Sequence, residues 1–154
     1  MIRNKNGFVL EPNEGDYLVF QGISTRIKVR SEQTNGAWTL IESTMEPHFM
    51  GFKQHTHQRI VENFYILEGT VRFCLDEREM DVTAGALVVV KPGMWHTYSN
   101  PFDAPAKYLL YIAPGGMEKF LEGIAESLRA EREGRGATDP AKLRALAEQY
   151  DATI

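Results

Sequence analysis

Short runs of β-branched and aromatic residues, separated at close intervals by turn residues, make up the chain as far as about Ala113. Such residues favour strands because they fit a pleated, half-buried surface, whereas pairs such as Asn35-Gly36 and Pro92-Gly93 favour turns. Many short strands at close spacing are typical of an antiparallel sandwich or barrel. We therefore predict an all-β domain with strands in the segments 17–20, 38–41, 64–67, 86–90 and 108–112.

The hydrophobic period changes after Gly116. Apolar residues then recur on one stripe at helical spacing, which predicts an amphipathic helix: Met117, Phe120, Leu121, Ile124 and Leu128. Further on, Asp139 followed by Pro140 is typical of an N-cap and a first helical position, which predicts a second short helix as far as about Tyr150. Both helices are too short to form a second domain. We therefore expect a barrel over residues 1–116 and a C-terminal helical tail over residues 117–154, packed on the barrel or on a partner.

Composition narrows the classes of function. The chain has 154 residues, a size typical of one domain. Its 17 Lys and Arg against 21 Asp and Glu give a net charge of -4, which argues against a nucleic-acid partner. Its single cysteine, Cys74, excludes an internal disulfide and a cysteine-based metal site. Because the sequence has neither an apolar run near the roughly 20 residues of a membrane helix nor the apolar core of a secretion signal, we expect a cytoplasmic protein without a membrane partner.

The residues that carry chemistry form a pattern of histidines and one carboxylate. His55 and His57 are two positions apart, so on a strand their side chains share a face and lie roughly 6.6 Å apart. Glu62 follows after a turn, and His96 begins a later strand behind a glycine turn. Three neutral imidazoles and one carboxylate suit one divalent transition metal (Fe, Mn, Ni, Zn, Co or Cu) better than Ca or Mg. The predicted metal ligands are therefore His55, His57, Glu62 and His96.

The same residues resemble the two sequence motifs of the cupin family. Residues 51–69 resemble the first motif, His-x-His followed by Glu and then Gly, and residues 85–100 resemble the second, a glycine turn followed by His and Asn. Two positions depart from the pattern, because Lys91 replaces a proline and Gly51 lies closer to His55 than usual. The resemblance implies a double-stranded β-helix, the cupin jelly-roll barrel, which holds a metal through these ligands.

The order of the elements is similar to that of small bacterial single-domain cupins resembling quercetin 2,3-dioxygenase, which carry a Gly-Gly-x-Glu-x-Phe-like helix start after the barrel, here residues 115–120. A metal of charge +2 beside the single negative charge of Glu62 favours a deprotonated hydroxyl or an enolate as a further ligand. We therefore expect a metal-dependent dioxygenase for a small phenolic or enolisable molecule, with Glu62 as both ligand and catalytic base. Two alternatives stay open: a metal-dependent isomerase or lyase, and a non-catalytic cupin that binds a small ligand.

Three further residues are candidates for substrate binding. Lys53 shares the predicted strand face of His55, so it either attracts an anionic substrate in the cavity or reaches water at the barrel rim. Tyr98 shares the face of His96 and either hydrogen-bonds a bound ligand or packs against the barrel wall. Phe64 belongs either to the apolar wall of the pocket or to the ordinary core.

Assembly follows from the edges of the predicted sheets. Exposed strand edges are usually covered in native proteins. The strand around residues 16–22 and the C-terminal helices are candidates for such a cover. We therefore expect a homodimer.

Overall fold

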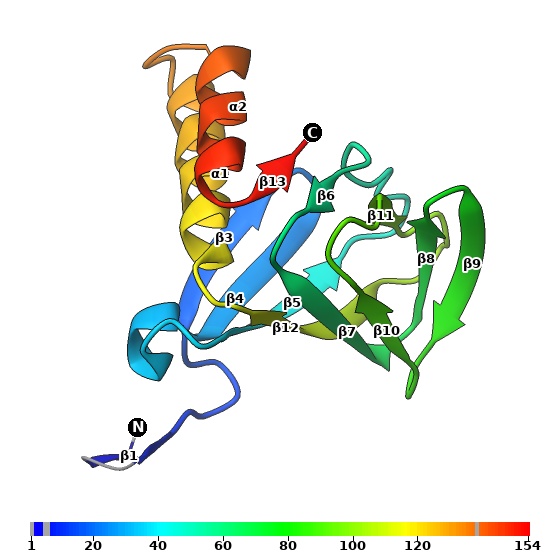
Figure 1. Cartoon of the computed structure of the whole chain (residues 1–154), viewed down its shortest axis with the longest axis horizontal. Coiled ribbons are helices and arrows are strands. Elements are labelled where there is room, and N and C mark those ends of the chain that lie inside the picture. Colours follow the sequence, from blue (N-terminus) through cyan, green and yellow to red (C-terminus); the bar gives the residue numbers. More distant parts are fainter. Residues whose placement is uncertain (1, 5–6, 138) are drawn as a thin grey trace.

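The computed structural model describes residues 2–4, 7–137 and 139–154. Two β-sheets face each other and form a barrel, and a helical hairpin stands beside the edge strand β3 (Figure 1). In this part of the chain the larger sheet has six strands, and each strand is antiparallel to its neighbours. Their order is β10 (Leu87–Val90), β7 (Val61–Glu68), β12 (Ala106–Ala113), β5 (Thr39–Met45), β4 (Ile23–Val29) and β3 (Asp16–Phe20).

The smaller sheet carries the second sequence motif. Its strands are β11 (His96–Ser99), β8 (Thr70–Leu75) and β9 (Arg78–Thr83). Single bridges from Phe49 to Asn100 and from His55 to His96 extend this sheet beyond β11. The start of the first motif and the residues just before it therefore lie beside the second motif.

Shorter elements complete the described chain. The strands β1 (Ile2–Asn4) and β2 (Gly7–Val9) form an N-terminal hairpin, and a 3-10 helix covers Ser31–Thr34. The short strand β6 (Thr56–His57) pairs with the C-terminal strand β13 (Ala152–Thr153).

The structure confirms the predicted all-β class with two C-terminal helices. The helices α1 (Met117–Arg132) and α2 (Pro140–Gln149) begin where the apolar stripe and the N-cap pattern predicted. The carboxylate of Asp139 accepts the N–H of Ala141 and so caps the first turn of α2. The return of the tail to the barrel through β13 was not predicted. The division of the chain at residue 116 stays a prediction.

The turn between β7 and β8 needs a glycine, as the first motif predicted. Gly69 has a φ of +74°, in the left-handed region, and a Cβ there would lie 2.5 Å from the carbonyl oxygen of Pro105. A side chain at this position would therefore collide with the neighbouring backbone.

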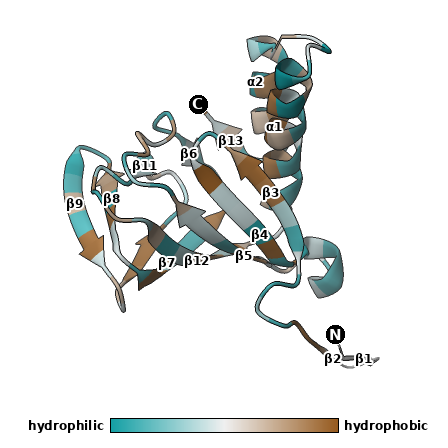
Figure 2. Cartoon of the chain, turned by 180° about the vertical axis from the view of Figure 1, so that it is seen from behind, coloured by the Kyte–Doolittle hydropathy of each residue, from teal (hydrophilic) through white to brown (hydrophobic). Residues whose placement is uncertain are grey.

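The core lies between the two sheets because residues alternate between inward and outward positions along each strand. On β7, Glu62, Phe64 and Ile66 are buried, whereas Tyr65 is exposed. Figure 2 shows hydrophobic and hydrophilic bands along the strands of the barrel. Burial of each large apolar side chain stabilises the fold by roughly 1.5–3 kcal/mol. This packing therefore fixes which residues face the interior.

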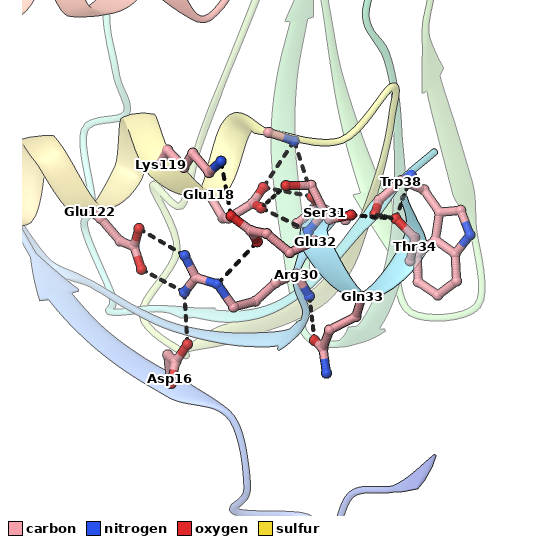
Figure 3. A network of polar contacts seen from close by, with 12 residues as sticks. Asp16, Arg30, Ser31, Glu32, Gln33, Thr34, Trp38, Glu118, Lys119 and Glu122 are labelled. Carbon is pink, nitrogen blue, oxygen red and sulfur yellow. Dashed lines mark hydrogen bonds and ion pairs between the residues drawn. The ribbon is translucent and has the colours of Figure 1, made fainter. Parts of the chain in front are cut away.

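Helix α1 is joined to the barrel by a buried carboxylate, that of Glu118, which is 0% exposed. It accepts the backbone N–H and the hydroxyl of Ser31, at 2.8 Å and 2.5 Å. It also accepts the hydroxyl of Thr39 at 2.6 Å and the N–H of Gly116 at 3.0 Å (Figure 3). Burial would raise the pKa of Glu118, but the donors from Ser31 and Thr39 hold that pKa below its ordinary value. The ionised carboxylate therefore links the start of α1 to Ser31 and to Thr39 of the barrel.

A group of ion pairs surrounds this junction (Figure 3). Arg30 binds Glu122 of α1 through two nitrogens, at 2.6 Å and 3.1 Å, and Asp16 of β3 at 2.7 Å. Lys119 pairs with Glu32 at 2.9 Å. These pairs are partly exposed, so each contributes little by itself. Together they fix the side of the barrel against which α1 stands.

The large sheet ends at β10 on one side and at β3 on the other, and α1 packs against β3. The expected homodimer stays a prediction.

None of the described helices is both long enough and apolar enough to cross a membrane.

We expect Glu118→Ala to lower the free energy of unfolding by about 2–4 kcal/mol, because several buried donors lose their acceptor at once. Denaturant unfolding followed by circular dichroism measures this change. Glu122→Ala is the matched control on the same helix, where we expect a loss of about 1 kcal/mol or less because its ion pair is partly exposed. Equal losses in both variants would contradict the role given to Glu118.

Candidate metal centre

Strand β7 carries Glu62 into the barrel interior. Its partners across the sheet are Val90 on β10 and Ile112 on β12, and both are buried. The alternation that buries Phe64 also turns the carboxylate of Glu62 inward, where the residue is 5% exposed. The larger sheet therefore supplies the acidic residue of the site.

Three histidines face Glu62 from the other side of the barrel. His55 and His96 are directly paired, since the N–H of each donates to the carbonyl of the other at 2.9 Å and 2.8 Å. Their ring centroids are 4.3 Å apart. His57 lies two positions beyond His55, and its ring centroid is 5.3 Å and 5.5 Å from the other two. Backbone pairing between the two sequence motifs thus brings the imidazoles together.

A glycine allows this close pairing. Gly51 has a φ of +88°, and a Cβ there would lie 2.6 Å from the carbonyl oxygen of Tyr98 on β11. The glycine that is displaced in the sequence motif therefore still permits the segment before His55 to lie against β11.

Each imidazole is oriented by a backbone carbonyl. The Nδ1 atoms donate over 2.9–3.1 Å: His55 to Lys53, His57 to Asp151 and His96 to Met94. Because a carbonyl oxygen can only accept, Nδ1 carries the proton in each ring and Nε2 keeps a lone pair. This is the tautomer that a metal bound through Nε2 requires.

The atoms at the centre of the cluster lack hydrogen-bond partners. Among the described buried side chains, these include Nε2 of His57, Nε2 of His96 and Oε2 of Glu62. Yet the Glu62 oxygen lies 2.7 Å from Nε2 of His96 and 3.5 Å from Nε2 of His57. Lone pairs at such distances repel unless a proton or a cation lies between them. One ligand atom from each of the four predicted residues lies within 4.8 Å of the others, so a small inward shift would let all four hold one ion.

The same atoms also bind protons. Burial lowers the pKa of His57, but the Glu62 carboxylate 3.5 Å away outweighs burial and raises the pKa above its usual value. Burial would raise the pKa of Glu62, yet His57 and His96 hold it well below its usual range. Burial, together with His96, lowers the pKa of His55 to about 4. At neutral pH the carboxylate is therefore ionised and His55 is neutral, so both can offer a lone pair to a metal.

A cavity of about 540 Å³ opens beside this cluster. His55, His57 and Glu62 line it, and most of its other lining residues are apolar. Helix α1 contributes Phe120, Ile124 and further residues of its apolar stripe, and α2 and the chain end contribute Leu143 and Ile154. The cavity therefore runs from the histidines to the space between the barrel and the helical hairpin.

Two tyrosines bring hydroxyl groups to this cavity. Tyr108 donates to the hydroxyl of Tyr98 at 3.2 Å, and both residues line the cavity. Burial raises the pKa of Tyr98 well above its usual value and raises that of Tyr108 to about 12. Both phenols therefore stay protonated at neutral pH, which makes them hydrogen-bond donors and not bases.

Of the three residues predicted for substrate binding, two line the cavity and one lies in the core. Lys53 and Tyr98 line the cavity, and Lys53 is also exposed, so it lies at the rim. Phe64 is 0% exposed and does not line the cavity. Its ring packs behind Tyr98, with the centroids 5.0 Å apart. Phe64 thus takes the core position that the sequence left open as an alternative.

Two features of the site have no signal in the sequence motifs. The backbone carbonyl of Asp151, 94 positions from His57, accepts the Nδ1 proton of that histidine. The apolar stripe of α1 predicted a helix with a packing face, but not that this face would wall the cavity beside the histidines. Both features depend on where the tail docks, and no local pattern encodes that position.

The comparisons with known proteins agree with this geometry. A family pattern described as "Cupin domain" matches residues 41–112. A quercetin 2,3-dioxygenase from Bacillus subtilis (strain 168) is 28% identical over 119 residues, which cover 77% of this chain and 35% of the relative. The chain thus spans about a third of the length of the curated relative that it matches.

Solved structures resemble the fold at low sequence identity. KdgF from Halomonas sp. is 15% identical with a TM-score of 0.64, and the match covers 74% of this chain and 99% of that one. The polyketide cyclase RemF from Streptomyces resistomycificus is 15% identical with a TM-score of 0.61, covering 73% and 80%. At this identity the likeness concerns the fold alone. Residues 41–112 therefore match the cupin domain, the fold is a cupin β-barrel, and the chain is similar to small cupins.

Proposed function

We propose that this protein is a metal-dependent enzyme that acts on a small molecule, and that its reaction is a dioxygenation of a phenolic or enolisable substrate. The observation that carries the proposal is the position of the cluster of His55, His57, Glu62 and His96, whose ligand atoms lie within 4.8 Å of one another beside a largely apolar cavity. The 28% identity to a protein named quercetin 2,3-dioxygenase supports the choice of reaction.

The metal would be held by Nε2 of the three histidines and by Oε2 of Glu62. When bound, a divalent transition metal supplies a Lewis acid and, if it is redox-active, electrons for chemistry with O2. The backbone carbonyls that accept from Nδ1 keep each ring in the ligating tautomer. The protein thus prepares the site through its own hydrogen bonds before any ion arrives.

Glu62 has a second role in this proposal, that of the catalytic base. Its carboxylate is buried and ionised at neutral pH, because the neighbouring histidines hold its pKa low. It faces the cavity from the same cluster that would hold the substrate oxygen. It is therefore placed to accept a proton from a substrate hydroxyl.

The cavity favours a substrate with an ionised oxygen and an apolar body. The oxygen would lie at the histidine cluster, and the body would contact Phe120 and Ile124 of α1. Lys53 adds a positive charge at the rim, which attracts an anionic substrate toward the mouth. A flavonol-like aromatic molecule has both features, in keeping with the name of the Bacillus subtilis relative.

A second candidate function rests on the tyrosine pair. Tyr108 is buried and Tyr98 partly buried, and both are protonated donors beside the cluster. A base in Glu62 and an acid in Tyr98 would suit an isomerase or lyase, which moves a proton within its substrate without consuming O2. The third possibility is a non-catalytic cupin that binds a small ligand.

One experiment separates these functions. Metal analysis of the purified protein is followed by a screen of phenolic and diketone compounds with an oxygen electrode and with product detection. Oxygen uptake that depends on protein and metal supports the dioxygenase. Product formation without oxygen uptake supports the isomerase or lyase, and binding without turnover supports the ligand-binding cupin.

We expect one divalent transition metal to bind per chain, with an affinity that falls as the pH is lowered. The imidazoles must be neutral to ligate, and the pKa of His57 is raised, so the fall should begin above the usual histidine value of about 6.5. Calorimetric titration with Co²⁺ or Zn²⁺ between about pH 8 and about pH 5.5 measures this. An affinity that does not change over this range would contradict ligation by these histidines.

We expect Glu62→Gln to keep part of the metal affinity and to lower turnover by about a hundred- to ten-thousandfold, because an amide oxygen can ligate but cannot accept a proton. His96→Ala should instead lose mainly the metal. His48→Ala is the control, because this histidine is exposed and pairs with Asp103 away from the cluster. Parental turnover by Glu62→Gln would exclude Glu62 as the base.

A further inference from the structure

The end of the chain returns to the strand that carries a predicted ligand. Strand β13 pairs antiparallel with β6, with Ala152 opposite His57 and Thr153 opposite Thr56. Figure 1 places β13 beside β6, after the chain has passed through both helices of the hairpin. The metal motif is therefore extended by a strand from the opposite end of the sequence.

Asp151 makes the contacts that join this strand to the cluster. Its backbone carbonyl accepts the Nδ1 proton of His57 at 2.9 Å. Its carboxylate accepts the backbone N–H of Arg59 at 2.8 Å and that of Ile60 at 3.2 Å. The side chain of Asp151 is only 10% exposed. Asp151 thus binds both the imidazole of His57 and the backbone of the segment that follows this histidine.

The backbone held by Asp151 has a defined place in the site. Residues 58–60 connect His57 on β6 with β7, which begins at Val61 and carries Glu62. In this segment the N–H groups of Arg59 and Ile60 point to the Asp151 carboxylate, so its shape depends on that carboxylate. A change there would alter the separation of two predicted ligands.

We propose that Asp151 is a positioning residue for the metal centre and that the C-terminal segment 151–154 acts as a clasp on His57 and Glu62. This inference rests on the metal-dependent function proposed above. Partners that orient a ligating histidine typically change metal affinity by about 10- to 100-fold. The clasp is thus a means by which the tail raises metal affinity without contributing a ligand.

The coupling also works in the other direction. If the docked tail raises metal affinity, the bound metal must favour the docked tail by the same factor. Leu143 of α2 and Ile154 line the cavity, so a docked tail also completes the apolar wall. Metal binding would then complete the substrate pocket.

The variants separate the carboxylate from the backbone. Asp151 has a φ of +65°, which glycine and asparagine adopt readily. Asp151→Gly removes the acceptor of the two N–H groups and keeps the carbonyl for His57, whereas Asp151→Asn retains one acceptor oxygen. Asp103→Gly makes the same chemical change at an exposed carboxylate. Deletion of residues 151–154 removes the whole clasp.

Metal affinity is measured by titration with Co²⁺, followed by its visible absorption. We expect a loss of about 10- to 100-fold for Asp151→Gly and a larger loss for the deletion. Asp151→Asn should lose less, and Asp103→Gly should match the parent. Parental affinity in folded Asp151→Gly would overturn the clasp, and so would equal losses in Asp151→Gly and Asp103→Gly.

Hydrogen exchange gives a second readout that does not depend on turnover. In the parent, Co²⁺ should slow exchange in segments 56–60 and 151–154 together, and Asp151→Gly should uncouple them. Protection of segment 56–60 by Co²⁺ without any change in segment 151–154 would overturn the clasp and leave the proposed metal centre intact. A parent that binds no Co²⁺, Zn²⁺ or other divalent transition metal would overturn the proposed function and the clasp with it.

Discussion

The rest of the site depends on the backbone pairing of His55 with His96. Two reciprocal hydrogen bonds join these residues, which are 41 positions apart and belong to different motifs. The bonds place both rings on one face of the smaller sheet. Because neighbouring side chains on paired strands project together, the rings must meet. The alternation of side chains along β7 turns Glu62 inward, so that it faces these rings from the larger sheet. The cluster is thus a consequence of how the two sheets close.

Such a cluster is costly for a folded protein, since buried lone pairs without donors oppose folding. The barrel tolerates it because the other nitrogen of each ring is satisfied and the core around the cluster is apolar. Each ring donates from Nδ1 to a carbonyl, and the surrounding strands bury an apolar core that includes Phe64 and Ile66. The unsatisfied atoms of His57, Glu62 and His96 lie together at the centre of the cluster. Such a concentration of lone pairs could hold a cation.

The tail joins the barrel at two ends, and each end uses a carboxylate. At the start of α1, Glu118 accepts several buried donors from the barrel and the preceding loop. At the end of the chain, Asp151 binds the segment that links His57 to β7. The hairpin between these anchors lines the cavity with apolar side chains. The tail is therefore both a wall of the pocket and a contact of the cluster.

The sequence by itself predicted the strands β3, β5, β7, β10 and β12 of the larger sheet, the two helices and the residues that cluster, because alternation, capping and motif spacing depend on near neighbours. Asp139 and Pro140 mark the start of α2 in this local way. Tertiary structure decided the rest. Phe64 lies behind Tyr98 because packing across the barrel, not parity along one strand, determines which inward side chains reach the cavity. The contact of Asp151 with His57 spans 94 positions and accompanies the pairing of β13 with β6, which no local pattern encodes.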